Sequence, residues 1–233
     1  MKINYALALA VACLLALNAT ADDLPSISPY AIFQTDDGEE EGTEYSGSAP
    51  LTATFYANAS DVGSYTAHYE WRFTLEGESD PYLIRYDENT EYTFTEAGSH
   101  SIELYATFIN GTDTVFYTSD YWETAEALTV TISESYLDFP NAFSPNGDGI
   151  NDVYKAKDGY QSIVEFHAAI FNRWGKVLYE WDDPAGGWDG TYNGKDVKQG
   201  VYFVVVKAKG ADGINFKFRR DVNLLRGYNE SAE

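Results

Sequence analysis

The stretch "GVYFVVVKAKGADGINFKFR", residues 200–219, reads as two β-strands joined by a tight turn. A continuous apolar run that includes Phe203, Val204 and Val206 predicts a first strand that is buried on both faces. After an Asp-Gly turn, apolar and polar residues alternate from Ile214 to Arg219, which predicts a second strand with one buried face. A β-hairpin of two long strands is therefore the expected unit of this fold.

The same pattern extends in both directions along the chain. Short runs rich in Val, Ile, Tyr, Phe and Thr recur between Gly, Asn and Asp turns, and helical periodicity is almost absent. Clear cases are "LTATFYANA" (51–59), "TAHYEWRFTL" (66–75), "EYTFTEAGSHSIELYATFING" (91–111) and "SIVEFHAAIFNRWGKVLYEW" (162–181). In the last of these, Asn172 is expected to open a turn that Gly175 closes with a positive φ. The fold class is predicted to be all-β, with two tandem immunoglobulin-like β-sandwiches after a cleaved signal peptide.

The N-terminus carries the pattern of a secretory signal peptide. One lysine precedes an apolar run from Ala6 to Leu17, and small residues then lead to an expected cleavage site after Ala21. An uncleaved anchor and lipidation of Cys13 are the weaker alternatives. Because Cys13 is the only cysteine, the mature chain would have none, and its domains would be held together by hydrophobic burial rather than by disulfides.

Charge divides the chain into two parts. The net charge is -22, and between Asp22 and Asp138 only Arg72 and Arg85 are basic, against two dozen acidic residues. After Asp138 the two signs nearly balance, which indicates two modules. The predicted layout is a signal peptide (1–21), an acidic N-terminal segment (22–47) with a solvated loop at 36–44, a first sandwich (48–134), a linker (135–138), a second sandwich (139–228) and a tail (229–233). Such acidity argues against nucleic acid as a partner.

The first module resembles the PKD family of extracellular immunoglobulin-like domains. The resemblance rests on the order "SAPLTATFYANAS", "YEWRF" and "YTFTEAGSHSIELYATF", and it covers roughly residues 48–132. A Trp on an inner strand, here Trp71, is what an immunoglobulin-like sandwich uses to fill its core.

The second module resembles the gliding-motility-associated C-terminal domain, the type B sorting domain of the type IX secretion system of Bacteroidetes. The resemblance covers residues 139–226 and is carried by "FPNAFSPNGDGINDVY", "IFNRWGKVLYE", "GWDGTYNGKDVKQGVYFVVVKA" and "VNLLR", in that order. It implies a β-sandwich that the type IX machinery recognises after Sec export. The motif residues that the resemblance assigns are Pro140, Asn141, Phe143, Pro145, Asn146, Gly147, Asp148, Gly149, Asn151, Asp152, Asn172, Arg173, Trp174, Gly175, Trp188, Asp189, Gly190, Gly200, Tyr202 and Arg226.

The motif at 139–154 has three interpretations from its residues. A calcium loop would use Asn146, Asp148, the carbonyl of Ile150 and Asp152, but Lys155 stands where an EF-hand places its bidentate glutamate. A phosphate cradle needs a following helix, which is not expected. The preferred interpretation is a structural turn, in which Asn and Asp side chains bind the backbone and the glycines adopt unusual φ values.

The sequence contains few residues or motifs that indicate catalysis or cofactor binding. The histidines at 68, 100 and 167 stand alone, and no nucleophile elbow, phosphate-binding loop or dinucleotide fingerprint is present. We therefore expect no enzymatic activity and no cofactor, with calcium as the one alternative. Tyr121 and Trp122 are candidates for an exposed aromatic platform that binds a ligand, although burial is the usual state of such large rings.

Together these patterns favour a non-enzymatic surface or secreted protein, with an adhesion or matrix module carried by a sorting domain. The alternative is a receptor module that binds a glycan or a cell-surface protein. The expected partners in export are the Sec translocon and the type IX secretion machinery of the outer membrane, and the expected location is the cell surface or the extracellular space.

Overall fold

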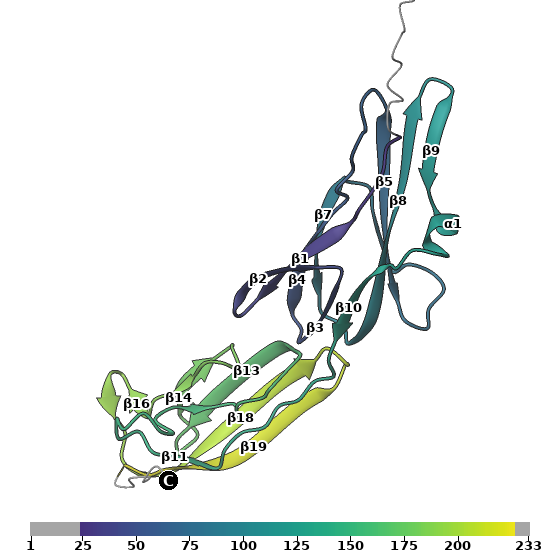
Figure 1. Cartoon of the computed structure of the whole chain (residues 1–233). Coiled ribbons are helices and arrows are strands. Elements are labelled where there is room, and N and C mark those ends of the chain that lie inside the picture. The colour runs from purple at the N-terminus through teal and green to yellow at the C-terminus, as the bar shows by residue number, and fades with distance from the viewer. Residues whose placement is uncertain (1–23, 227–233) are drawn as a thin grey trace, which may run out of the picture.

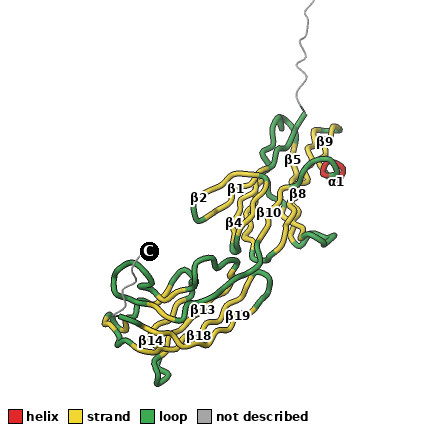
Figure 2. The backbone as a smooth tube through the Cα atoms, turned by 60° about the horizontal axis from the view of Figure 1, so that its bottom comes forward, coloured by secondary structure: helices red, strands yellow, loops and turns green. Residues whose placement is uncertain are grey.

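The computed structural model describes residues 24–226, which form two β-domains joined end to end (Figures 1 and 2). The expected signal peptide (1–21) and tail (229–233) lie outside the described residues. Strands dominate both domains, as predicted, and only one short helix occurs within residues 24–226. No helix in that range is long and apolar enough to cross a membrane.

The first domain is a sandwich of two sheets. One sheet has the order β2-β1-β4-β7, formed by β1 (Tyr30–Thr35), β2 (Gly38–Gly42), β4 (Leu51–Tyr56) and β7 (Asn89–Phe94). The other has the order β3-β10-β8-β5-β6 with β9 attached to β8, formed by β3 (Glu44–Gly47), β5 (Thr66–Leu75), β6 (Leu83–Arg85), β8 (Gly98–Asn110), β9 (Asp113–Tyr117) and β10 (Leu128–Ile132). The helix α1 (Ser119–Trp122) connects β9 to the segment before β10.

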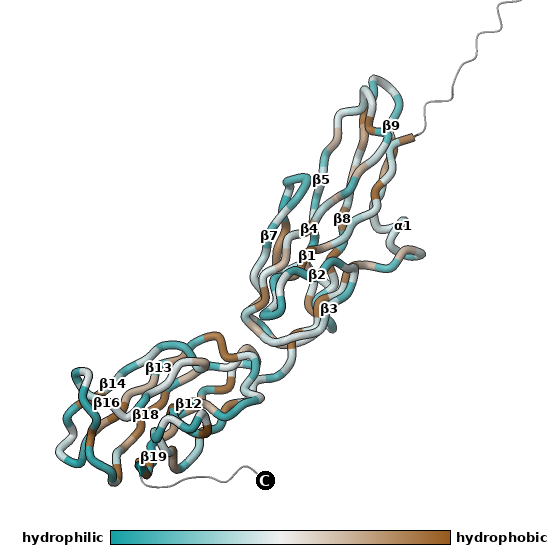
Figure 3. Tube along the Cα trace, turned by 60° about the vertical axis from the view of Figure 1, so that its left-hand side comes forward, coloured by the Kyte–Doolittle hydropathy of each residue, from teal (hydrophilic) through white to brown (hydrophobic). Residues whose placement is uncertain are grey.

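Aromatic side chains fill the space between these sheets. Trp71, Phe73 and Phe55 are fully buried, and Phe55 lies 5.8 Å from Trp71 and 5.2 Å from Phe73 between ring centroids. The alternation that the sequence shows along β4, β5 and β8 becomes alternating buried and half-exposed positions, and hydropathy varies along the strands accordingly (Figure 3). Trp71 therefore has the core role expected for it.

The predicted start of the first domain is wrong. Residues 30–47, assigned to an acidic segment outside the sandwich, form β1, β2 and β3, and β1 pairs with β4 while β3 pairs with β10. The acidic stretch that was expected to be a loop is largely the edge strand β2, which pairs with β1. Its glutamates remain in solvent, because every residue of Gly38–Glu41 is exposed. Charge at an edge strand discourages pairing with another chain, which explains how so acidic a run can be a strand.

The second domain has one long sheet and a layer of short pieces. The sheet has the order β11-β19-β18-β13-β14, formed by β11 (Ala142–Phe143), β13 (Ile163–Phe171), β14 (Val177–Trp181), β18 (Gly200–Gly210) and β19 (Asn215–Leu224). Its inner face is covered by loops and by two small two-stranded sheets, β12 (Tyr154–Lys155) with β15 (Gly187–Trp188) and β16 (Thr191–Tyr192) with β17 (Lys195–Asp196). Trp188, Tyr154 and Phe139 are the largest buried side chains of its core.

The central strand β18 differs from the prediction. Val204 and Val206 are buried, but Phe203 is 44% exposed, so the strand has one buried face rather than two. Phe203 pairs with Phe171 and with Asp221 on the outer face of the sheet, and no second layer covers that face. An apolar run does not reveal which of its residues is covered, because that depends on what packs above the sheet. Ile214 is likewise exposed, in the turn before β19.

The two domains meet through the turn between β18 and β19. The amide of Ala97 donates to the carbonyl oxygen of Ala211 at 3.1 Å, and Ala211 is buried in the core cluster of the first domain. The Ser162 hydroxyl contacts the amide of Ala49 and the hydroxyl of Ser133, at 3.2 and 2.8 Å. One fixed junction therefore joins the domains.

The predicted linker 135–138 is part of that junction rather than a free connection. Ser135 donates from its amide and its hydroxyl to Asp212, at 2.9 and 2.7 Å. Leu137 is buried in the second core, and Asp138 binds Lys157 and Arg220. The second domain thus begins before residue 139.

Candidate functional site

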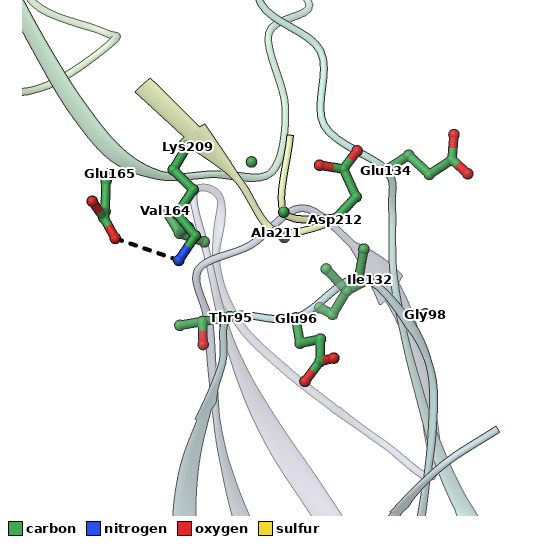
Figure 4. A pocket seen from close by; sticks show the side chains of 13 residues that line it. Thr95, Glu96, Gly98, Ile132, Glu134, Val164, Glu165, Lys209, Ala211 and Asp212 are labelled. Carbon is green, nitrogen blue, oxygen red and sulfur yellow. Dashed lines mark ion pairs between the residues drawn. The ribbon is translucent and has the colours of Figure 1, made fainter. Parts of the chain in front are cut away.

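Two regions merit consideration as sites: a hollow at the junction, and the end of the second domain that faces away from the first. The hollow has a volume of about 830 Å³ and is lined by residues of both domains (Figure 4). Its polar side chains include Glu96, Glu134 and Asp212, and an ion pair of 3.7 Å joins Glu165 to Lys209. Its lining contains no histidine.

Hydrogen bonds at the junction lower the pKa of Asp212. Burial acts to raise the pKa of this carboxyl, but the hydrogen bonds from Ser135 and Ile214 outweigh it, and the pKa is lowered. The carboxylate therefore serves to fix the connection between the domains.

The predicted motif residues gather at the other end of the second domain. Gly200 begins β18 and pairs with Leu224 at the end of β19, whereas Gly210, at the far end of β18, adjoins the junction. The motif loop, the turn between β13 and β14, the Trp188–Gly190 segment and Arg226 lie near Gly200, at the free end of the domain (Figure 1). We call this region the distal end.

The loop Ser144–Asp152 is held by its own side chains. Asp152 accepts the amide hydrogens of Asn146, Gly147 and Gly149, at 2.9, 2.8 and 2.8 Å. These backbone bonds, the one from Gly147 first, lower the pKa of the Asp152 carboxyl. Gly147 and Gly149 have φ of 82° and 85°, which only glycine adopts at no cost.

The same loop bears on the calcium interpretation. Asp148 accepts the amide of Ile150 at 2.9 Å and the side-chain amide of Asn146 at 2.8 Å, so both candidate carboxylates bind the loop itself. Among residues 24–226, no group of three His, Cys, Asp or Glu side chains is placed to hold a metal ion. The hydrogen bonds that Asp148 and Asp152 accept from the backbone of the loop support the interpretation of the motif as a structural turn.

Arg226 joins three separate segments at the distal end. Its guanidinium group donates to the carbonyl oxygens of Pro145, Gly190 and Val197, at 3.1, 2.7 and 3.1 Å, and it lies 3.3 Å from Asp196. The motif residues that surround this contact are structural. Trp188 is fully buried, and Tyr202 stacks against it edge-on at 5.1 Å.

Other motif residues attach the first strand of the domain. The carbonyl of Asn141 accepts the amide and the side-chain amide of Asn223, at 2.9 and 3.2 Å, and Phe143 pairs with Leu224. Asp189 accepts the amide of Thr191 at 2.9 Å. Pro140 precedes β11. The backbone carbonyl oxygen of Asn151 accepts the amide of Ser144 at 2.8 Å.

The turn between β13 and β14 has the form expected from its sequence. Gly175 has a φ of 80°, and the side-chain oxygen of Asn172 accepts the amides of Trp174 and Lys176, each at 3.0 Å. Trp174 is 78% exposed, with the guanidinium of Arg173 lying 4.6 Å from its ring centroid. Unlike Trp188, it contributes nothing to the core.

Tyr121 and Trp122, the residues of the predicted aromatic platform, are only partly exposed. Both lie in α1, and both are half-buried against the first core. Their rings meet edge to face at 4.9 Å, and the indole of Trp122 donates to the carbonyl of Leu104 at 3.1 Å. Contacts with α1 and the first core therefore cover part of each ring.

The lone histidines are consistent with structural or surface roles. His100 is buried, with one ring nitrogen 2.9 Å from the carbonyl oxygen of Glu96 and the other 3.0 Å from the Tyr82 hydroxyl. His167 lies 2.7 Å from Asp182 on the surface, and His68 is exposed.

The fold and the distal end define a two-domain, all-β protein whose second domain carries the motif set of an export signal. Residues 137–217 match the family model of the CHU_C type IX secretion signal domain. The C-terminal domain is therefore a type IX secretion signal domain, and such a domain marks a protein for the type IX secretion machinery and for export to the cell surface or the extracellular space. No curated protein matches the chain.

Proposed function

We propose that this protein is a non-enzymatic surface or secreted protein in which the second domain serves export and the first is the displayed module. An N-terminal signal peptide would first direct the chain through the Sec translocon. The observation that carries the proposal is that the sorting motifs meet at the distal end, which the first domain leaves uncovered. Because these motifs lie on the side of the second domain that faces away from the first domain, the secretion machinery can recognise them while the first domain is folded.

The first domain is proposed to act as a PKD-like adhesion or matrix module. Its sandwich is filled by side chains of the core, and its outer surface is strongly acidic. That charge favours solubility outside the cell and disfavours anionic membrane surfaces.

The test is localisation in the native host, with and without residues 139–233, by protease treatment of intact cells and a periplasmic control protein. We expect the intact protein at the surface and the truncated chain in the periplasm. A companion fusion of residues 134–233 to a reporter protein behind the same signal peptide should reach the surface, which guards against misfolding of the truncated chain. Equal surface exposure of the intact and truncated chains would refute the proposal.

A receptor that binds a glycan or a cell-surface protein is the second candidate. The observation that favours it is that aromatic and cationic side chains are exposed on the outer face of the sheet formed by β5, β8 and β9. There Phe116 is 63% exposed and pairs with Thr107, which pairs with His68, and Arg72 lies 3.8 Å from the ring centroid of Tyr105. Glycan binding that Phe116→Ala abolishes and Tyr121→Ala leaves intact would support this role.

A further inference from the structure

Trp174 has an unusual position for a tryptophan. The turn that carries it is fixed by two hydrogen bonds to Asn172, yet the side chain is 78% exposed. Large aromatic side chains are usually mostly buried, and a rigidly presented one is typical of a binding hot spot. Neither the core nor the distal-end contacts of Arg226 require this indole.

Further apolar side chains lie around it. Val177, Val201 and Phe203 are 38%, 50% and 44% exposed, and pairing between β13 and β18 sets Phe203 beside Phe171. A hollow of about 680 Å³ lies among Trp174, Leu178, Val201 and Phe203. Contiguous exposed apolar surface of this kind marks interaction sites on soluble domains.

The lining of this hollow has a charge opposite in sign to that of the protein, whereas the exposed Asp221 lies directly across the sheet from Phe203. The hollow is lined by two cationic residues, Arg173 and Lys198, and by no acidic residue, although the net charge of the chain is -22. Burial raises the pKa of Tyr202, while Arg226 and Arg173 act in the opposite direction.

We propose that the distal patch, which we define as Arg173, Trp174, Val177, Lys198, Val201 and Phe203, docks an acidic polypeptide segment of the secretion machinery. The segment would place an aliphatic or aromatic side chain in the hollow and carboxylates beside Arg173 and Lys198. This inference rests on the proposed export function and deepens it, because it assigns recognition to one surface of the domain. The buried motif residues then hold that surface in shape.

The test uses the full chain in the native host, with Trp174→Ala and with the double variant Arg173→Glu/Lys198→Glu. The matched control is Lys207→Glu/Lys217→Glu, which makes the same charge change at two exposed residues that pair on the outer face of the same sheet. We expect each patch variant to lower the surface-exposed fraction at least about tenfold, because loss of one hot-spot side chain weakens binding roughly thirtyfold. The control should export normally, and all purified variants should unfold at the wild-type temperature, since the changed side chains are exposed.

The truncated chain, which ends at Asp138, separates the two proposals. If it stays in the periplasm while the patch variants reach the surface as the wild type does, the docking surface is wrong and the export function stands. If the truncated chain reaches the surface, the export function itself fails. Two other occupants would also overturn the inference: Trp174-dependent binding of the purified protein to phosphatidylglycerol vesicles, or a Trp174-dependent dimer in sedimentation.

Discussion

Arg226 donates from Nη2 to the carbonyl oxygen of Gly190 at 2.7 Å, and the glycine allows this contact because it lacks a side chain. A Cβ at position 190 would lie 3.1 Å from the same guanidinium nitrogen and 3.0 Å from Cγ of Pro145. The contact between these two residues, 36 positions apart, therefore requires a residue without a side chain at position 190. Together they connect the strand β19 to the loop after Trp188.

Gly190→Ala should destabilise the second domain by about 2 to 4 kcal/mol, because it adds a steric contact to the cost of a positive φ. The control is Gly194→Ala, since Gly194 also has a positive φ, 71°, but has open space around it. That variant should lose about 1 kcal/mol. Urea unfolding of the full chain measures both, and equal losses would show that the contact with Pro145 and Arg226 is unimportant.

Arg226→Ala should cost about 2 to 4 kcal/mol, because three carbonyl groups at the distal end lose a charged donor. The exposed Arg219 of β19, the strand that precedes Arg226, serves as control. Arg219→Ala should change the free energy of unfolding by less than about 0.5 kcal/mol. Thermal unfolding in parallel compares the two. A similar small effect for both would contradict the structural role of Arg226.

Asp138 should make the stability of the protein sensitive to acid. A hydrogen bond from Lys157, and then bonds from the Phe139 backbone and Arg220, lower the pKa of this carboxyl from 3.8 to about 2. A lowered pKa in the folded state adds stability that is complete above the unfolded value and is lost as the pH falls toward the folded value. We expect about 1 to 2 kcal/mol after solvent screening, present above pH ~4 and lost toward pH ~2.

The measurement for Asp138 is the free energy of unfolding of wild type and Asp138→Asn across that pH range. The two curves should differ at pH 6 and converge near pH 2. Parallel curves at all pH values would mean that the ion pairs with Lys157 and Arg220 do not contribute.

The loop Ser144–Asp152 should keep its shape without calcium. Asp152→Ala removes the acceptor of three amides and should lower the unfolding temperature more than Asp148→Ala, which removes the acceptor of one backbone amide. Excess calcium or a chelator should leave the wild-type temperature unchanged. A rise of several degrees with calcium that Asp152→Ala abolishes would restore the metal interpretation.

Much of this protein follows from local sequence patterns. Alternation along residues 51–56 and 66–75, the positive φ of Gly175, and the core role of Trp71 depend on strand periodicity and turn chemistry, which are properties of neighbouring residues. The motifs of the second domain could likewise be identified from the order of their residues along the chain. These features could be predicted without knowing which segments of the chain pack against one another.

Only the tertiary structure decided which of these residues meet and which remain uncovered. Arg226 contacts Pro145 and Gly190 because the strand order returns the end of the chain to the start of the domain. Phe203 is exposed and Trp122 half-buried because burial depends on the layer above each strand, which periodicity does not specify. Local sequence patterns determined the alternating strands, the turns and the motifs of the export signal. Packing between distant segments decided that the acidic run forms an edge strand, and which motif residues are exposed for recognition.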